Sequence, residues 1–142
     1  DSLEDPHNLG AILRSAEAAG VHGVIIPKRN SVTLNYTVAK TSAGAIEYVP
    51  VVKVANLPAA IDELKSRGVW IFGADMDGTD YTALDYSGSI ALVIGSEGKG
   101  IGRLVREKCD FIASLPMRGK INSLNASVAA GILMFEAAKH RN

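Results

Sequence analysis

Apolar residues recur along the chain at two spacings, and each spacing predicts one kind of secondary structure. Recurrence every three or four residues is typical of a helix that buries one face. This spacing predicts a first helix between Asp5-Pro6, which can cap and open a helix, and Gly20, which can end one. The predicted helices are 5–19, 36–43, 56–67, 104–109 and 124–139.

Short continuous apolar runs bounded by glycine or proline predict buried strands. The predicted strands are 23–26, 69–74, 90–94 and 111–115, and Pro50 makes the β-rich segment 48–54 an edge or irregular strand. Segment 75–89 is expected to be the longest irregular stretch. Strands that alternate with helices in this way predict an α/β fold, a mostly parallel sheet with helices on both faces.

The last predicted helix, 124–139, has apolar residues almost all round its circumference. Such a helix is expected to be buried on more than one side, which suits a subunit interface. Near the preceding short helix, Arg103, Arg106 and Lys108 are interpreted as solvated charges.

Length and composition indicate an ordinary globular domain spanning residues 1–142, with 47% hydrophobic and 21% charged residues. No apolar run approaches the roughly 20 residues that span a bilayer, so no membrane segment is expected. Cys109 is the single cysteine, which permits no internal disulfide and suits a cytoplasmic protein. The three histidines are scattered, and no metal site is predicted.

Candidate chemistry gathers where two predicted strands end. The run 90–94 leads into Gly95-Ser-Glu-Gly-Lys-Gly100, and the run 111–115 leads into a polar loop that carries Asn122, Ser123 and Asn125. Ligands of open α/β sheets bind at the carboxyl ends of strands, and glycines allow a close approach of backbone groups.

Two nucleotide-binding motifs are excluded at this glycine-rich loop. A Walker A loop would need Lys followed by Ser or Thr where Ile101 and Gly102 stand. The segment 98–103 is not a dinucleotide-binding fingerprint either, because its last position is Arg103. A nucleotide-hydrolysing or NAD-binding enzyme therefore has little support.

Three motifs in order resemble those of the SpoU/TrmH family of SPOUT RNA methyltransferases. They are Asn8-x-Gly10-x-x-x-Arg14, the segment Gly95-Ser96-Glu97-Gly98-x-Gly100, and Pro116-Met117 followed by Ser123-Leu124-Asn125-x-Ser127-x-Ala129. Together they extend over nearly the whole chain, and the overall match is closest to RlmB-type 23S rRNA (guanosine-2′-O-)-methyltransferases.

The resemblance implies a C-terminal deep trefoil knot and S-adenosyl-L-methionine as cofactor, with no metal. It implies that three loops wrap the cofactor, starting at Gly73, at Gly95 and at Leu115. The implied cofactor-binding residues are Gly73, Gly95, Leu115, Ser123 and Leu124, and the implied catalytic residues are Asn8, Arg14, Glu97 and Asn125.

Several of these residues also have plain structural interpretations. Asn8, Ser123 and Asn125 could cap helices, Glu97 could pair with an arginine or a helix N-terminus, and Arg14 could be a solvated helix residue. The resemblance makes Arg14 the base that takes the 2′-hydroxyl proton. Because a guanidinium stays protonated at neutral pH, electrostatic stabilisation of the alkoxide is the alternative.

The resemblance implies RNA as the substrate, with a guanosine of 23S rRNA as the preferred target and a tRNA ribose as the alternative. A non-catalytic RNA-binding module is the alternative function. The 15 basic and 15 acidic residues give no net charge, although phosphate binding uses clustered cations. The basic loop 28–31 could contact phosphates or be solvated. We therefore expect an additional N-terminal RNA-binding domain outside this sequence, and a homodimer built around the knotted region.

Overall fold

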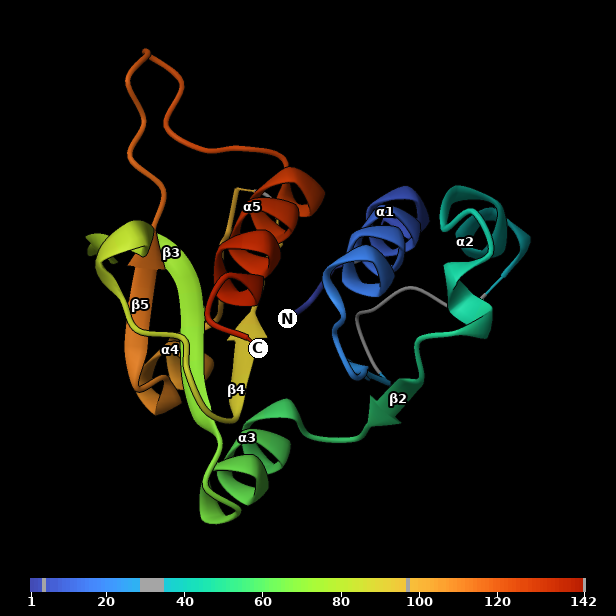
Figure 1. Cartoon of the computed structure of the whole chain (residues 1–142), viewed down its shortest axis with the longest axis horizontal. Helices are drawn as coiled ribbons and strands as arrows, with labels where there is room; N and C mark the ends of the chain where they lie inside the picture. Colours follow the sequence, from blue (N-terminus) through green and yellow to red (C-terminus); the bar gives the residue numbers. More distant parts are fainter. Residues whose placement is uncertain (4, 29–34, 97, 142) are drawn as a thin grey trace.

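The computed structural model describes residues 1–3, 5–28, 35–96 and 98–141. Along these residues helices alternate with short strands, as the apolar pattern predicts (Figure 1). The α-helices are α1 (Pro6–Ala19), α2 (Tyr36–Thr41), α3 (Leu57–Ser66), α4 (Arg103–Lys108) and α5 (Ala126–Ala138), and the 3₁₀ helices are η1 (Ala45–Glu47) and η2 (Tyr81–Ala83). The strands are β1 (Val24–Pro27), β2 (Val51–Val54), β3 (Trp70–Asp80), β4 (Ile90–Val93) and β5 (Phe111–Ser114).

All strand pairs are parallel, which confirms the predicted α/β class. The pair β1–β2 forms one sheet, and the other has the order β4-β3-β5. Both sheets lie beneath the same helices, because Val24 of β1 and Leu92 of β4 pack against one apolar cluster that joins α1 to α5.

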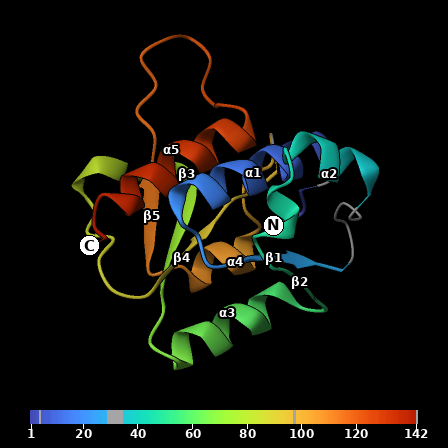
Figure 2. The same ribbon diagram turned by 45° about the vertical axis from the view of Figure 1, so that its right-hand side comes forward.

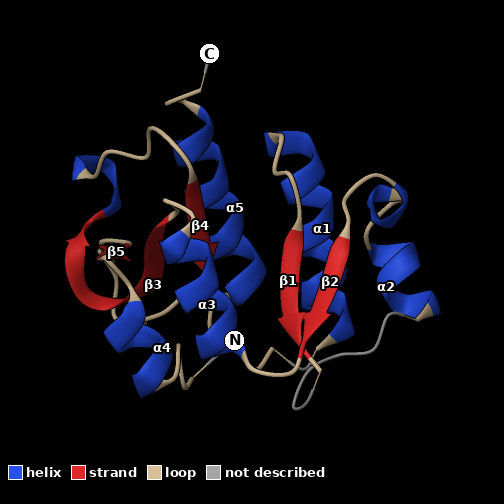
Figure 3. Cartoon of the chain, turned by 90° about the horizontal axis from the view of Figure 1, so that it is seen from below, coloured by secondary structure: helices blue, strands red, loops and turns tan. Residues whose placement is uncertain are grey.

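Helices cover both faces of the strands, as predicted. In Figure 2, α1, α2 and α5 lie on one side of the strands, and α3 and α4 lie on the other. Successive residues of β4 show why: Leu92 packs towards α1 and α5, whereas Ala91 and Val93 pack towards Ile61 of α3 and Val105 of α4. Figure 3 shows β1 and β2 with α1 behind them.

Capping residues set most helix ends where the sequence predicts them. The Asp5 side chain accepts a hydrogen bond from the His7 N–H, and Gly20 ends α1 at φ 82°. Helix α5 begins two residues later than predicted, since Asn125 caps it by accepting from the N–H groups of Ser127 and Val128.

The prediction that 75–89 is irregular is wrong for its first part. Strand β3 continues to Asp80, but Ala74 and Thr79 both pair with Ala113 of β5, so residues 75–78 loop out of the ladder. Residues 75–80 lack an apolar alternation that would predict a strand. Thr79 and Asp80 rejoin the ladder by pairing with β5, which is distant in sequence. The trefoil knot stays a prediction.

Helix α5 buries one face in the single chain. Its buried residues are Ala126, Ala130, Leu133, Met134 and Ala137. Val128 and Phe135 remain 50% and 49% exposed. The predicted burial on a second side is therefore not met within one chain. None of the helices formed by the described residues combines the length and apolar character that a membrane span requires.

Candidate functional site

The carboxyl ends of three strands meet at one edge of the larger sheet. Gly73 of β3 stands opposite Val93 of β4 and Ile112 of β5. Gly95 and Leu115 follow those partners by two and three residues, so the two loops leave neighbouring strands at the same edge. This is the edge at which α/β proteins bind ligands.

Helices α1 and α5 both start at the end towards which these strands point (Figure 1). Asn8 lies in the first turn of α1 and is buried, and Asn125 is the residue that caps α5. The structure thus brings Asn8 and Asn125 to the loop-bearing end of the fold. The capping interpretation is wrong for Asn8, since Asp5 caps α1, and confirmed for Asn125.

The glycine loop folds tightly on itself. Ser96 and Gly100 form an isolated antiparallel bridge, and the Gly100 N–H donates to the Ser96 carbonyl at 2.8 Å. A Cβ atom on Gly95 would lie 2.1 Å from the carbonyl carbon of Gly100. Gly95 is thus required by the loop's own packing. Glu97 lies outside the described residues.

Gly73 occupies a different position from the one predicted. It lies inside β3 rather than at the start of a loop, because the ladder with β5 continues beyond it. A Cβ atom there would stand 2.7 Å from Cys109 Sγ and 2.9 Å from Ile101 Cδ1. The missing side chain makes room for the core, so only backbone groups of Gly73 are available to a ligand.

The third predicted cofactor loop projects from the body of the molecule. Residues 116–125, which include Ser123 and Leu124, are all exposed, and Leu115 is half-buried. Figures 1 and 2 show this segment extending beyond the end of β5 and the start of α5. Asn125, rather than Ser123, is the N-cap of α5.

Arg14 lies on the exposed side of α1, although its neighbours Ile12 and Leu13 are buried. It stands six residues after Asn8, which corresponds to about 9 Å along a helix axis. No ion pair or hydrogen bond links Arg14 to the strand-end loops within the described part of the chain. The structure thus confirms that Arg14 projects from a firmly packed helix.

An ion pair that sequence reasoning missed links the looped-out segment of β3 to α4. Arg106 Nη1 lies 2.5 Å from Asp75 Oδ2. On the same helix, Lys108 Nζ lies 2.9 Å from Asp62 of α3. The interpretation of Arg106 and Lys108 as solvated charges is therefore wrong. Sequence spacing carried no signal for either pair, because 31 and 46 residues separate the partners.

Two titratable groups near the loops have shifted pKa values. Hydrogen bonds from the Thr82 N–H and hydroxyl lower the pKa of Asp80, and the positive charge of Arg118 in the projecting loop adds to this shift. Burial raises the pKa of the Cys109 thiol to about 11, with the Asp110 carboxylate acting in the same direction. Cys109 is therefore a thiol at neutral pH and a poor nucleophile.

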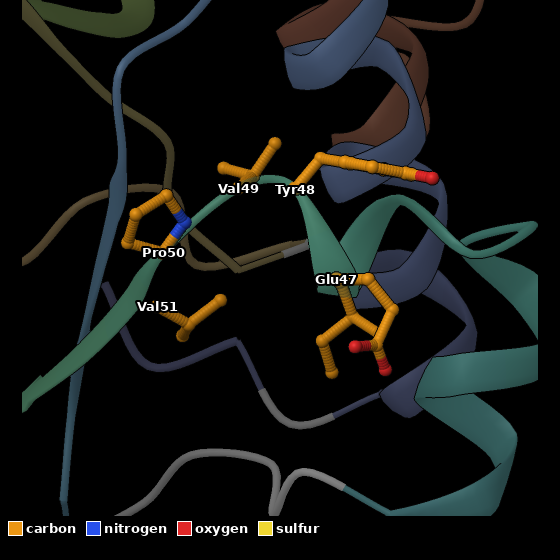
Figure 4. Close-up of a pocket in the computed structure, with 6 residues that line it drawn as sticks. Glu47, Tyr48, Val49, Pro50 and Val51 are labelled. Atoms are coloured by element: carbon orange, nitrogen blue, oxygen red, sulfur yellow. The ribbon is translucent and has the colours of Figure 1, made fainter.

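Two hollows of the described surface are lined by residues outside the strand-end loops. One of about 200 Å³ is lined by residues 46–51, which run from η1 into the first residue of β2, so it adjoins the amino end of that strand (Figure 4). Another of about 500 Å³ lies where the start of α3 meets Leu104 and Lys108 of α4. Groups of three or more His, Cys, Asp or Glu side chains able to hold a metal are absent from the described residues.

Comparisons with known proteins converge on one family. The model of the SpoU rRNA Methylase family matches residues 1–135. The Bacillus subtilis protein YacO, named for the TrmH family of tRNA/rRNA methyltransferases, is 58% identical over all of this chain, which spans 57% of YacO.

Solved structures agree in fold. The SpoU methyltransferase AviRb from Streptomyces viridochromogenes, solved in complex with the cofactor AdoMet, is 31% identical with a TM-score of 0.89, over 97% of this chain and 57% of AviRb. An RNA 2′-O ribose methyltransferase is 28% identical with a TM-score of 0.83, over 98% of this chain and 54% of its own. The chain thus spans little more than half the length of these relatives.

Proposed function

Because the chain belongs to the SpoU rRNA methylase family, we propose that it binds S-adenosyl-L-methionine at the carboxyl edge of β3, β4 and β5 and methylates a ribose 2′-hydroxyl of RNA. The observation that carries this proposal is the convergence of the glycine loop and the projecting loop at one sheet edge. The AdoMet complex of AviRb and the RNA 2′-O ribose methyltransferase support it by similarity.

The groups at this edge suit the cofactor. Adenosine presents a flat apolar ring with hydrogen-bonding edges, and pockets for such ligands combine apolar walls with a few polar backbone groups. The projecting loop offers backbone groups together with Leu115, Met117 and Leu124, of which the last two are exposed. We assign cofactor binding to Gly73 through its backbone, Gly95, Leu115, Ser123 and Leu124.

The chain's own residues must align the ribose and help its hydroxyl lose a proton. The sulfonium of the cofactor supplies an activated methyl group. Asn8 and Asn125 lie at the starts of α1 and α5, on rigid elements that hold them at the loop-bearing end. We assign substrate positioning to them and to Glu97. Arg14, as base or as a charge that stabilises the alkoxide, acts on the 2′-oxygen.

For the whole protein we propose a cytoplasmic enzyme that acts on a guanosine of 23S rRNA, with a further N-terminal domain that contributes RNA affinity. The names of the relatives include both tRNA and rRNA, so a tRNA ribose is the second candidate. Mass mapping of ribose methylation in cells lacking the gene distinguishes the two, because loss of a methyl group from tRNA would contradict the rRNA assignment.

We also propose a homodimer. Val128 and Phe135 are seven residues apart on α5 and therefore lie on one face of the helix, and each is about half exposed. An exposed apolar stripe on a helix whose other face is packed marks a contact surface.

The test of this function begins with the wild-type chain and two substitutions of Arg14. Calorimetry should show binding of S-adenosyl-L-methionine without added metal. Arg14→Ala should leave cofactor affinity unchanged, because Arg14 is exposed, and should slow methyl transfer at least about 10²–10³-fold, the typical cost of one electrostatic stabiliser.

Arg14→Lys separates the two roles of the arginine. Lysine keeps the positive charge but loses the planar fork that grips a phosphate. Partial transfer activity in Arg14→Lys indicates charge stabilisation, and activity as low as that of Arg14→Ala indicates that the fork geometry is needed. Single-turnover transfer of a tritiated methyl group measures both, and wild-type rates in Arg14→Ala would remove Arg14 from the mechanism.

A further inference from the structure

The Asp75–Arg106 ion pair joins the segment that follows Gly73 to the helix that follows the glycine loop. Asp75 is the first residue of the looped-out segment 75–78, and Arg106 lies on α4, which follows the glycine loop. The side chains of Arg106 and Asp75 are 36% and 24% exposed. Such partly buried, charge-assisted contacts are stronger than those between fully solvated charges.

The Asp75 carboxylate holds its own segment in shape. Its Oδ1 accepts a hydrogen bond from the Met76 N–H at 2.8 Å, while Oδ2 faces Arg106. The Arg106 guanidinium also reaches the Met76 carbonyl at 3.4 Å. The backbone N–H and the carbonyl of Met76 are thus both held by the Asp75–Arg106 pair.

The same carboxylate lies against the glycine loop. A Cβ atom on Gly100 would stand 3.3 Å from Asp75 Oδ1, so the bare Cα of Gly100 packs beside the carboxylate. Gly100 in turn packs on Gly95, where the loop leaves β4. One ion pair therefore connects segment 75–78, Gly100 of the glycine loop and helix α4.

Helix α4 gives this connection a firm base. Val105 is buried in the cluster that includes Ile101 and Ile71, so the backbone that carries Arg106 is fixed by the core. The ion pair transfers that rigidity to two segments whose own residues are largely polar or glycine. By contrast, residues 116–125 of the projecting loop are exposed throughout.

We propose that Asp75 and Arg106 are positioning residues that preform segment 75–78 and the glycine loop beside the proposed cofactor site, an inference that rests on the proposed function. A loop already ordered before binding loses less conformational entropy when the ligand arrives, and affinity rises accordingly. Removal of the pair should therefore weaken cofactor binding while leaving the rate at saturating cofactor nearly unchanged.

The test compares this pair with a matched pair on the same helix. Asp75→Asn and Arg106→Gln should each raise the Kd for S-adenosyl-L-methionine about tenfold, and the double variant should be no worse than the singles, because one interaction is lost in each. Arg106→Lys should restore part of the affinity. Asp62→Asn and Lys108→Gln, which break the Lys108–Asp62 pair between α4 and α3, should change Kd less than twofold.

Two further measurements separate positioning from general destabilisation. In amide hydrogen exchange without cofactor, Asp75→Asn should accelerate exchange in 75–78 and 96–100 at an unchanged unfolding midpoint. Steady-state kinetics should show a higher KM for the cofactor with kcat within about twofold of wild type. Unchanged exchange and Kd in both Asp75→Asn and Arg106→Gln would overturn the positioning role alone, whereas failure of the wild-type chain to bind the cofactor would overturn the proposed function as well.

Discussion

At the scale of single residues, the glycines of the strand-end loop are required by the fold itself. The space where a Gly95 side chain would lie is filled by the backbone of Gly100 and Ile101. A substitution at Gly95 therefore disturbs the packing of the loop, whether or not Gly95 contacts the cofactor. Loss of cofactor binding in Gly95→Val would not by itself show that Gly95 touches the cofactor.

Gly95→Ala should accordingly lower the free energy of unfolding by about 1–3 kcal/mol, the usual cost of overpacking a tight site. Gly119 is the matched control, since a Cβ atom there meets nothing within 4 Å and the residue is exposed. Gly119→Ala should change stability by less than about 0.5 kcal/mol. Urea unfolding of both variants without cofactor makes the comparison, and equal stability of the two would show that the loop can relax around a side chain.

At the scale of secondary structure, Asn125 combines two tasks at the start of α5. Its side-chain oxygen accepts from the Ser127 N–H at 2.9 Å and the Val128 N–H at 3.3 Å, which fixes the first turn of the helix. The same residue is assigned to the active site. Because capping already restricts the Asn125 rotamer, little further side-chain entropy is lost when the residue contacts a ligand.

Substitutions that keep or remove the cap separate these tasks. Asn125→Asp retains an oxygen acceptor, so the free energy of unfolding should be nearly unchanged, but the loss of the amide and the added charge should suppress methyl transfer. Asn125→Ala should lose transfer activity and also about 1 kcal/mol of stability. Chemical unfolding and single-turnover transfer, measured side by side, report the two effects. Wild-type turnover in Asn125→Asp would remove Asn125 from the active site.

At the scale of the whole molecule, the exposed stripe on α5 predicts assembly. Val128→Glu places a charge in the proposed dimer contact, and burial of an unpaired charge is costly, so this variant should be monomeric. Val52→Glu on β2 is the control, because Val52 is 52% exposed and Val128 is 50% exposed. Light scattering at micromolar concentration should give a dimer mass for wild type and Val52→Glu. A dimer that persists in Val128→Glu would exclude this face of α5.

Elements whose signals lie between neighbouring residues could be predicted from the sequence. The α1 ends follow from Asp5 and Gly20, which act within one turn, and the alternation of apolar runs predicts the parallel α/β class that the ladders show. The three motifs identified the family, because a motif is recognised from residue types and their order along the chain and needs no knowledge of the fold.

Contacts between segments that are distant in the sequence could be identified only in the folded chain. The continuation of β3 as far as Asp80 depends on its pairing with β5. Position 73 requires a glycine because Cys109 and Ile101 fill the space beside it. Asp75 pairs with Arg106, which lies 31 residues further along the chain. Spacing along the chain carries no signal for such contacts, because their energy comes from packing and charge between surfaces that exist only once the chain has folded.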